Sequence, residues 1–151
     1  MSKKGFQGED NKLLLDTSFL LPILGFETSG RIMRAFRKLG RYELYYSDLS
    51  ILEALWKILK VVRGLDEEVS RIEEGVTAIK ETMKHAPVDG EAVRSAIRMY
   101  MMGHRDMIDN LLLSIAASRG LKLLTVDEDL IDFAKRHGLA RDAIAAPEDL
   151  G

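Results

Sequence analysis

The chain has 151 residues, 46% of them hydrophobic and 30% charged, which is the size of one domain with a substantial core and excludes an intrinsically disordered protein. It contains no cysteine, which excludes a disulfide framework, a thiolate nucleophile and a zinc–thiolate site, and no apolar run long enough for a membrane helix. The formal net charge of −2 means that binding of nucleic acid would require a local basic patch or bound cations.

The predicted elements follow a polar segment, residues 1–12, which we expect to be a flexible tail and not a signal peptide, so that a cytoplasmic location fits best. In chain order, hydrophobic periodicity and capping residues predict a strand at 12–16, a short helix at 17–24, a helix from Thr28 or Ser29 to Leu39 and a strand at 42–46. Helices are predicted next at 48–62, 66–83, 91–102 and 105–119, followed by a strand at 121–125, a helix at 127–137 and an edge strand at 143–146. Strands that alternate with helices indicate an α/β fold with a mostly parallel sheet. Because no repeat or linker divides the chain, residues 13–151 should form one domain, with 66–83 in a projecting hairpin of helices.

Four carboxylates fall near the ends of predicted strands or the starts of predicted helices. Asp16 is the last residue of the first strand, and Asp127 follows the third strand by two residues. Glu53 lies within two turns of the start of its helix, and Asp109 lies about one turn into another. Ligands of open parallel sheets bind outside the carboxyl ends of the strands. This topology can therefore bring the four acids to one edge.

Each acid also has a purely structural interpretation. Asp16 fits an N-cap, Glu53 fits a capping box opened by Ser50, and Asp127 fits the negative charge favoured at a helix N-terminus. Asp109 differs because its neighbours three, four and seven positions ahead are apolar, which directs its carboxylate toward the interior. A buried carboxylate must be protonated, paired or bound to a metal.

Acids without cysteine or a clear histidine ligand suit a hard cation, with Mg²⁺ or Mn²⁺ expected. The natural substrate of such a site is a phosphodiester, because the metal activates water and neutralises the developing charge. Asp129 is a candidate fifth, peripheral acid, and Asp106 is a candidate supporting group beside Asp109. Ser18 and Thr125 are candidates to hydrogen-bond the acids, with helix capping as the alternative. The three histidines are expected at the surface or in turns.

These residues resemble the motifs of the PIN-domain family, which includes the VapC-type toxin ribonucleases. Residues 13–18 resemble the family's opening strand, in which small hydroxyl residues follow an aspartate, and the segment around Glu53 is similar to its second motif. The best match is 109–129, an aspartate-led helix, a glycine, and a strand that ends in Thr125, any residue and Asp127. The resemblance covers about residues 13–138.

Two positions depart from the family pattern. Asn110 stands where a small alanine is common, and Leu130 stands where phenylalanine often follows the last acids. Neither departure removes a metal ligand. What the resemblance implies is a central parallel sheet of about four to five strands sandwiched by helices, and an endoribonuclease dependent on Mg²⁺ or Mn²⁺. Its catalytic acids and metal ligands would be Asp16, Glu53, Asp109 and Asp127.

The resemblance also implies frequent homodimers, and for many members a toxin that a small antitoxin protein holds inactive, while others process RNA. Arg31 and Arg34, on one predicted helix beside the cleft, are candidates to contact RNA phosphate, with a solvated helix face as the alternative. A catalytically silent binding module of the same fold is a rival, although such a protein would be expected to lose one acid. A phosphatase or a receiver domain is disfavoured because Thr17 and Ser18 follow Asp16.

Overall fold

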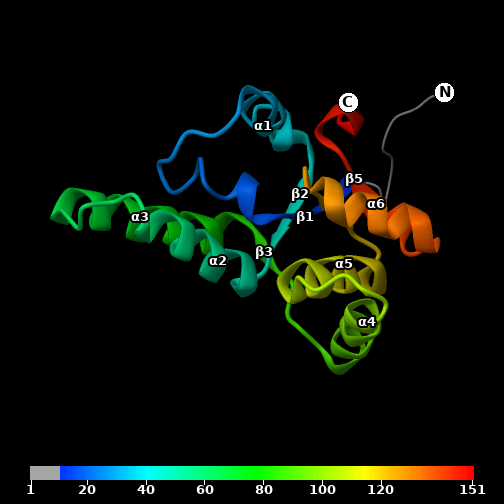
Figure 1. Ribbon diagram of the computed structural model, residues 1–151. Helices are drawn as coiled ribbons and strands as arrows, with labels where there is room; N and C mark the ends of the chain where they lie inside the picture. Colours follow the sequence, from blue (N-terminus) through cyan, green and yellow to red (C-terminus); the bar gives the residue numbers. More distant parts are fainter. Residues whose placement is uncertain (1–10) are drawn as a thin grey trace.

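A computed structural model describes residues 11–151, so the predicted tail lies outside the described residues except for its last two, of which Lys12 opens the first strand. Figure 1 shows a central sheet with helices on both sides. The strands are β1 (Lys12–Leu15), β2 (Glu43–Tyr46), β3 (Lys84–His85), β4 (Lys122–Leu124) and β5 (Ile144–Ala145). They form one five-stranded sheet in the order β3-β2-β1-β4-β5, and every neighbouring pair is parallel. The predicted α/β class with a parallel sheet is confirmed.

The helices lie in the connections between these strands. They are α1 (Gly30–Phe36), α2 (Asp48–Leu59), α3 (Asp66–Thr82), α4 (Gly90–Met101), α5 (Met107–Arg119) and α6 (Glu128–His137), with short 3-10 turns η2 (Thr17–Phe19), η3 (Leu39–Arg41), η4 (Arg141–Ala143) and η5 (Pro147–Asp149). None of the helices in residues 11–151 is long and apolar enough to cross a bilayer.

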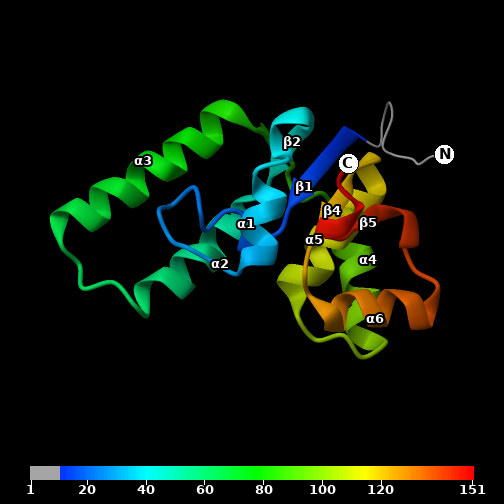
Figure 2. The same cartoon turned by 90° about the horizontal axis from the view of Figure 1, so that it is seen from above.

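Strand β1 is the centre of the core, as its apolar sequence predicts. Leu13, Leu14 and Leu15 have no exposed surface, because β1 is paired on both edges and covered on both faces. Side chains of a strand alternate between its faces. Leu13 and Leu15 accordingly join an apolar cluster with residues of α1, α2 and α3, while Leu14 joins a second cluster with α4, α5 and α6. Figure 2 shows the two groups of helices on opposite sides of the sheet.

Helices α2 and α3 extend away from the sheet as the projecting hairpin that the sequence predicts (Figures 1 and 2). Close packing at its base requires a glycine. A Cβ atom placed on Gly75 of α3 would lie 2.6 Å from the backbone oxygen of Ile23 and 2.8 Å from a methyl group of Leu24. Both distances are too short for any side chain, so α3 can approach the segment after η2 only through Gly75.

Four local predictions differ from the structure, of which one is the helix predicted at 48–62, which ends at Leu59. The segment predicted as a helix at 17–24 forms only the turn η2 followed by further turns, and the helix predicted to reach Leu39 ends at Phe36 before η3. The two-residue edge strand β3 is missing from the predictions, because its exposed Lys84 and His85 carry no apolar pattern. Pairing with β2 alone makes it a strand.

Candidate active site

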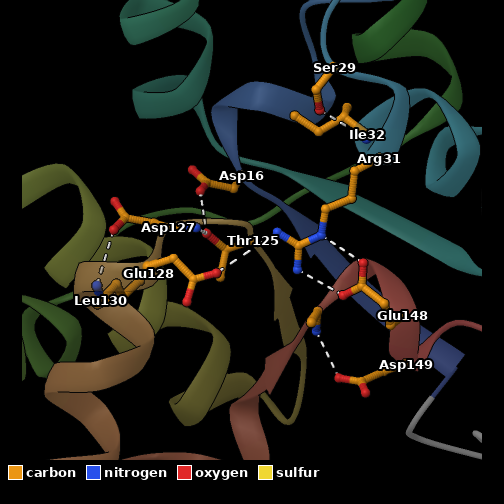
Figure 3. Close-up of polar contacts among 11 residues, drawn as sticks. Asp16, Ser29, Arg31, Ile32, Thr125, Asp127, Glu128, Leu130, Glu148 and Asp149 are labelled. Atoms are coloured by element: carbon orange, nitrogen blue, oxygen red, sulfur yellow. Dashed lines mark hydrogen bonds and ion pairs between the residues drawn. The ribbon is translucent and has the colours of Figure 1, made fainter.

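The carboxyl edge of the sheet brings Asp16 and Thr125 together from the two central strands. Asp16 directly follows β1 and is 6% exposed, and Thr125 directly follows β4 and is fully buried. The Thr125 hydroxyl donates a hydrogen bond of 2.6 Å to Asp16 Oδ2 and accepts one of 3.0 Å from the Asp127 backbone N–H. A single hydroxyl group therefore positions two of the predicted acids (Figure 3).

Asp16 also serves the structural role considered from the sequence. Its Oδ1 accepts a hydrogen bond of 2.7 Å from the backbone N–H of Thr17 and caps the turn η2. Burial raises the pKa of Asp16, and the negative charges of Glu53 and Asp127 raise it further, while the hydrogen bonds from Thr125 and Thr17 lower it. Asp16 therefore caps η2 and, at the same time, lies buried close to Glu53 and Asp127.

Glu53 reaches the same edge from α2. Its Oε1 accepts a hydrogen bond from the hydroxyl of Thr17, the residue next to Asp16. The capping-box interpretation of Glu53 is wrong, because α2 begins at Asp48 and its N-cap is Ser47, whose hydroxyl accepts from the Leu49 N–H at 3.1 Å. Thr17 is thus a site residue that the sequence patterns did not reveal, because a threonine after a strand is also an ordinary turn residue.

Asp109 lies in the interior, as its position on α5 predicts, and is 4% exposed. Burial, followed by its hydrogen bond to Asp127 and the charges of Asp16, Asp106 and Asp127, raises the pKa of Asp109 to about 10. At neutral pH the Asp109 carboxyl group is therefore protonated, and its O–H group donates a hydrogen bond to the carboxylate of Asp127. Asp106 is the N-cap of α5, and its Oδ1 accepts from the Asp109 N–H at 3.1 Å.

Asp127 is the N-cap of α6 and is partly buried. Its Oδ1 accepts a hydrogen bond of 3.1 Å from the Leu130 N–H. Burial alone would raise its pKa, but the hydrogen bond from Asp109, the Leu130 N–H and the nearby His104 together lower the pKa of Asp127. The acid pair therefore holds one proton on Asp109 and one negative charge on Asp127.

The potential ligand atoms at this edge suit a hard cation, because all four predicted acids present carboxylate oxygens. Within residues 11–151, however, no three His, Asp or Glu side chains stand close enough together to hold a metal ion as they are placed. The hydrogen bonds of Thr125, Thr17 and Asp109 each hold one carboxylate instead. The acids are neighbours at one edge of the sheet, and their side chains would have to turn toward a common point to share an ion.

The remaining candidate acids and hydroxyls lie at the margin. Asp129 is exposed in the first turn of α6 and, with Asp106, lines a separate cavity of about 540 Å³. Ser18 is half-buried in η2, where the hydroxyl group that contacts an acid is that of Thr17.

The half-buried His104 and the buried Asn110 form a link beside the acids, which the sequence patterns did not predict. The His104 ring lies 5.2 Å from the ring of Phe133, and its Nδ1 lies 2.7 Å from Asn110 Oδ1. Asn110 Nδ2 donates to the backbone oxygen of His104 at 2.7 Å and to that of Ala96 at 3.4 Å. Asn110, the departure from the family pattern, therefore fastens the loop between α4 and α5. His104 lies in the loop between α4 and α5, as the expectation of a surface or turn residue allows, and it is half-buried there.

The two predicted phosphate-binding arginines lie on α1 and differ in their surroundings. Arg31 makes a two-pronged contact with Glu148 of η5, from Nε to Oε2 at 2.6 Å and from Nη2 to Oε1 at 2.7 Å. Its Nη1 lies 3.9 Å from Glu128 Oε2, next in sequence to Asp127. Arg34 is exposed and adds to the positive charge that Glu148 faces. Figure 3 shows the Arg31 guanidinium between Glu148 and Glu128.

A sequence model of the PIN domain matches residues 13–136 of the chain. No curated protein matches it in a sequence search. Among solved structures it is similar to FitAcB from Neisseria gonorrhoeae (16% identity, TM-score 0.64, covering 91% of this chain and 99% of the other). It is also similar to VapBC-5 of Mycobacterium tuberculosis, a member of a family of toxin–antitoxin systems (19% identity, TM-score 0.58, covering 90% of this chain and 97% of the other). A third similar structure is VapC20 of the same organism, a toxin that cleaves the Sarcin–Ricin loop (16% identity, TM-score 0.57, covering 85% of this chain and 97% of the other). At these identities the likeness shows the fold.

Proposed function

Since the chain belongs to the PIN-domain family, as the match over residues 13–136 shows, we propose that it is a metal-dependent ribonuclease that hydrolyses RNA phosphodiester bonds. Its main support is the crowding of Asp16, Glu53, Asp109 and Asp127 from four separate segments at one sheet edge, where the pKa of Asp109 is raised to about 10. Strongly shifted carboxyl groups in a cleft mark candidate functional sites. Packing alone gives no reason to gather them.

Asp16, Asp109 and Asp127 are the proposed ligands of Mg²⁺ or Mn²⁺, with Glu53 completing the site. The cation would supply activation of water and neutralisation of the charge that develops on the phosphate. The protein's own groups prepare this site. Thr125 holds Asp16 and the start of α6 in place. Asp109 must release its proton to become a ligand, so binding should release protons and strengthen as the pH rises.

RNA is the proposed substrate, a small antitoxin the proposed partner and the cytoplasm the proposed location. VapC20 of Mycobacterium tuberculosis cleaves the Sarcin–Ricin loop, and several similar structures are toxin–antitoxin complexes.

The chain also exposes Leu52, Trp56 and Leu59 of α2, which repeat at helical spacing on one face of the projecting hairpin. Exposed apolar patches commonly mark protein interfaces. A homodimer is a further expectation of the family.

Cleavage of RNA by the purified protein is the direct test. The wild type should cleave in Mg²⁺ or Mn²⁺ and stop in chelator. Asp16→Asn and Asp127→Asn should lose nearly all activity, because each substitution removes a proposed ligand. Asp66→Asn is the matched control, since Asp66 is exposed at the start of α3 on the projecting hairpin.

All proteins must be purified identically, because contaminating ribonuclease is the main artefact. Equal cleavage by wild type and Asp16→Asn would attribute the activity to a contaminant. Binding of RNA without cleavage by the wild type would make the chain a catalytically silent binding module of the same fold.

A further inference from the structure

We propose that Glu148 competes with the RNA backbone for Arg31, so that the C-terminal turn η5 covers a phosphate-binding groove on α1 and releases Arg31 when RNA binds. This inference rests on the proposed function only in that the ligand is RNA that continues to the carboxylates at the sheet edge. It requires RNA to bind and does not require RNA to be cleaved.

The geometry of the Arg31 contact is that of phosphate recognition. Two nitrogens of one guanidinium face two oxygens of Glu148, at 2.6 and 2.7 Å. The fork of an arginine makes the same paired contact with a carboxylate and with a phosphate group. A backbone phosphate with two oxygens in the place of Oε1 and Oε2 would therefore make the same two hydrogen bonds. Glu148 is a carboxylate where such a phosphate would sit.

The groove around this contact is basic. A cavity of about 340 Å³ separates α1 from η5, and its charged lining residues are Arg31, Arg34, Arg37 and Lys38 against the single acid Glu148. The chain as a whole has a formal net charge of −2. A local patch of this sign is what such a chain needs to hold a polyanion.

The groove lies near the carboxylates at the sheet edge. Arg31 Nη1 lies 3.9 Å from Glu128, which follows Asp127 and opens α6. Figure 3 shows Arg31 reaching from α1 to a position between Glu148 and the group formed by Asp16, Thr125 and Asp127. A strand of RNA held at Arg31 could thus continue to the proposed cleavage site.

The turn η5 does not depend on Glu148 for its place. Pro147 is buried, Leu150 is 4% exposed within the core cluster of β1, and the Gly151 N–H donates to the Tyr42 hydroxyl at 3.0 Å. The turn is closed by Asp149, whose Oδ2 accepts from the Ala146 N–H at 2.8 Å. Arg31 and Glu148 are 35% and 61% exposed, and an ion pair this accessible contributes little to folding. The pair can therefore open while the C-terminus remains docked.

Arg31 is released when a phosphate competes with Glu148 for it, and not when Glu148 is protonated. The hydrogen bond and charge of Arg31 lower the pKa of Glu148 to about 2, so both groups are ionised at any pH at which the protein would act. A rival anion is needed to separate them. Salt should weaken the internal pair and the RNA contact alike, so the two must be compared at the same ionic strength.

The test measures RNA binding in the Asp16→Asn background with a short single-stranded RNA oligonucleotide. Glu148→Gln should lower Kd by about 3- to 10-fold at a fixed salt concentration, because Arg31 no longer has to leave a carboxylate before it contacts a phosphate. The slope of log Kd against log salt should stay that of the wild type, because the same phosphates are neutralised in both complexes. The matched control is Glu43→Gln, which removes the same charge from another exposed pair, with Lys84 at 2.7 Å on the edge of the sheet. It should change neither quantity. Adding Arg31→Ala to Glu148→Gln should abolish the increase in affinity.

Glu148→Asp provides a second variant, because it keeps the charge but shortens the side chain, and it should give a smaller increase in affinity. The proposal would be overturned if Glu148→Gln bound RNA no better than Glu43→Gln. It would also be overturned if Glu148→Gln had a lower melting temperature without tighter RNA binding, because the ion pair would then have a purely structural role. Absence of RNA binding by every variant would overturn it as well.

Cleavage by the wild type separates the two proposals. If the wild type cleaves but Glu148→Gln binds no more tightly, only the competition fails. Tighter binding by Glu148→Gln without wild-type cleavage leaves the competition standing and removes the nuclease.

Discussion

Replacing Asp109 by asparagine should stabilise the protein in the absence of metal, and by more as the pH rises. In the unfolded chain Asp109 has its ordinary pKa of 3.8, whereas in the folded protein its pKa is raised to about 10 by burial and by the neighbouring acids. Between these values the folded state binds one more proton than the unfolded state. Stability therefore falls as the pH increases, at about 1.4 kcal/mol per pH unit.

This slope sets the magnitude. From pH 3.8 to neutral pH, about three units, the raised pKa of Asp109 costs about 4 kcal/mol. The lowered pKa of Asp127 offsets part of that cost, because its ionised form accepts the Asp109 hydrogen bond. We therefore expect a net gain of about 2 kcal/mol for Asp109→Asn at neutral pH, which corresponds to a rise in melting temperature of about 4 to 8 °C. The asparagine amide can donate the same hydrogen bond without titrating.

Thermal unfolding in chelator between pH 5 and 8 measures this effect. The difference between Asp109→Asn and wild type should grow with pH, while Asp66→Asn, at the exposed start of α3, should show no gain and a loss of about 0.3 to 1 kcal/mol from the helix terminus. A variant less stable than wild type at every pH would refute the protonated state of Asp109. It would make its carboxylate a structural hydrogen-bond acceptor.

Addition of Mg²⁺ or Mn²⁺ extends the same experiment. At a concentration one hundred times Kd, either ion should stabilise the wild type by about 2.7 kcal/mol. At a fixed ion concentration the stabilisation should grow with pH, because Asp109 must lose its proton before it can bind the ion, and it should be largely absent from Asp109→Asn. Wild-type protein that neither gains stability nor shows heat of binding in calorimetric titration would contradict the proposed ligands.

Three further substitutions test individual contacts. Thr125→Val removes the hydroxyl that joins Asp16 to the start of α6, so we expect a loss of about 1 to 3 kcal/mol in denaturant unfolding and reduced cleavage; unchanged stability would show that this bridge is dispensable. Asn110→Ala should cost a similar amount and raise amide hydrogen exchange in the loop before α5, whereas exchange equal to wild type would mean that other contacts hold that loop. Gly75→Ala should destabilise by about 1 to 3 kcal/mol, while Gly90→Ala, where the added methyl group meets open space, should not; equal effects of the two would contradict the close approach of α3.

The local sequence was enough to predict the class of fold and the place of the acids. A run of leucines ending in an aspartate identified β1 as central, and this is confirmed because β1 is paired on both edges and its three leucines are fully buried. The apolar spacing after Asp109 predicted its burial in the same way. These signals are local, since they depend on residues a few positions apart in a strand or a helix. The roles of the acids stay predictions.

The contacts between distant residues around the candidate site depend on the tertiary structure alone. Thr17 meets Glu53 from 36 residues away, and Arg31 meets Glu148 from 117 residues away. No periodicity or capping pattern encodes such pairs, because they form only when the crossovers of a parallel sheet bring distant segments to its carboxyl edge. The same is true of the proton on Asp109. Its sequence position predicts burial, which is the largest cause of its raised pKa, but only the assembled neighbours add the hydrogen bond to Asp127 and the nearby negative charges that raise the pKa further.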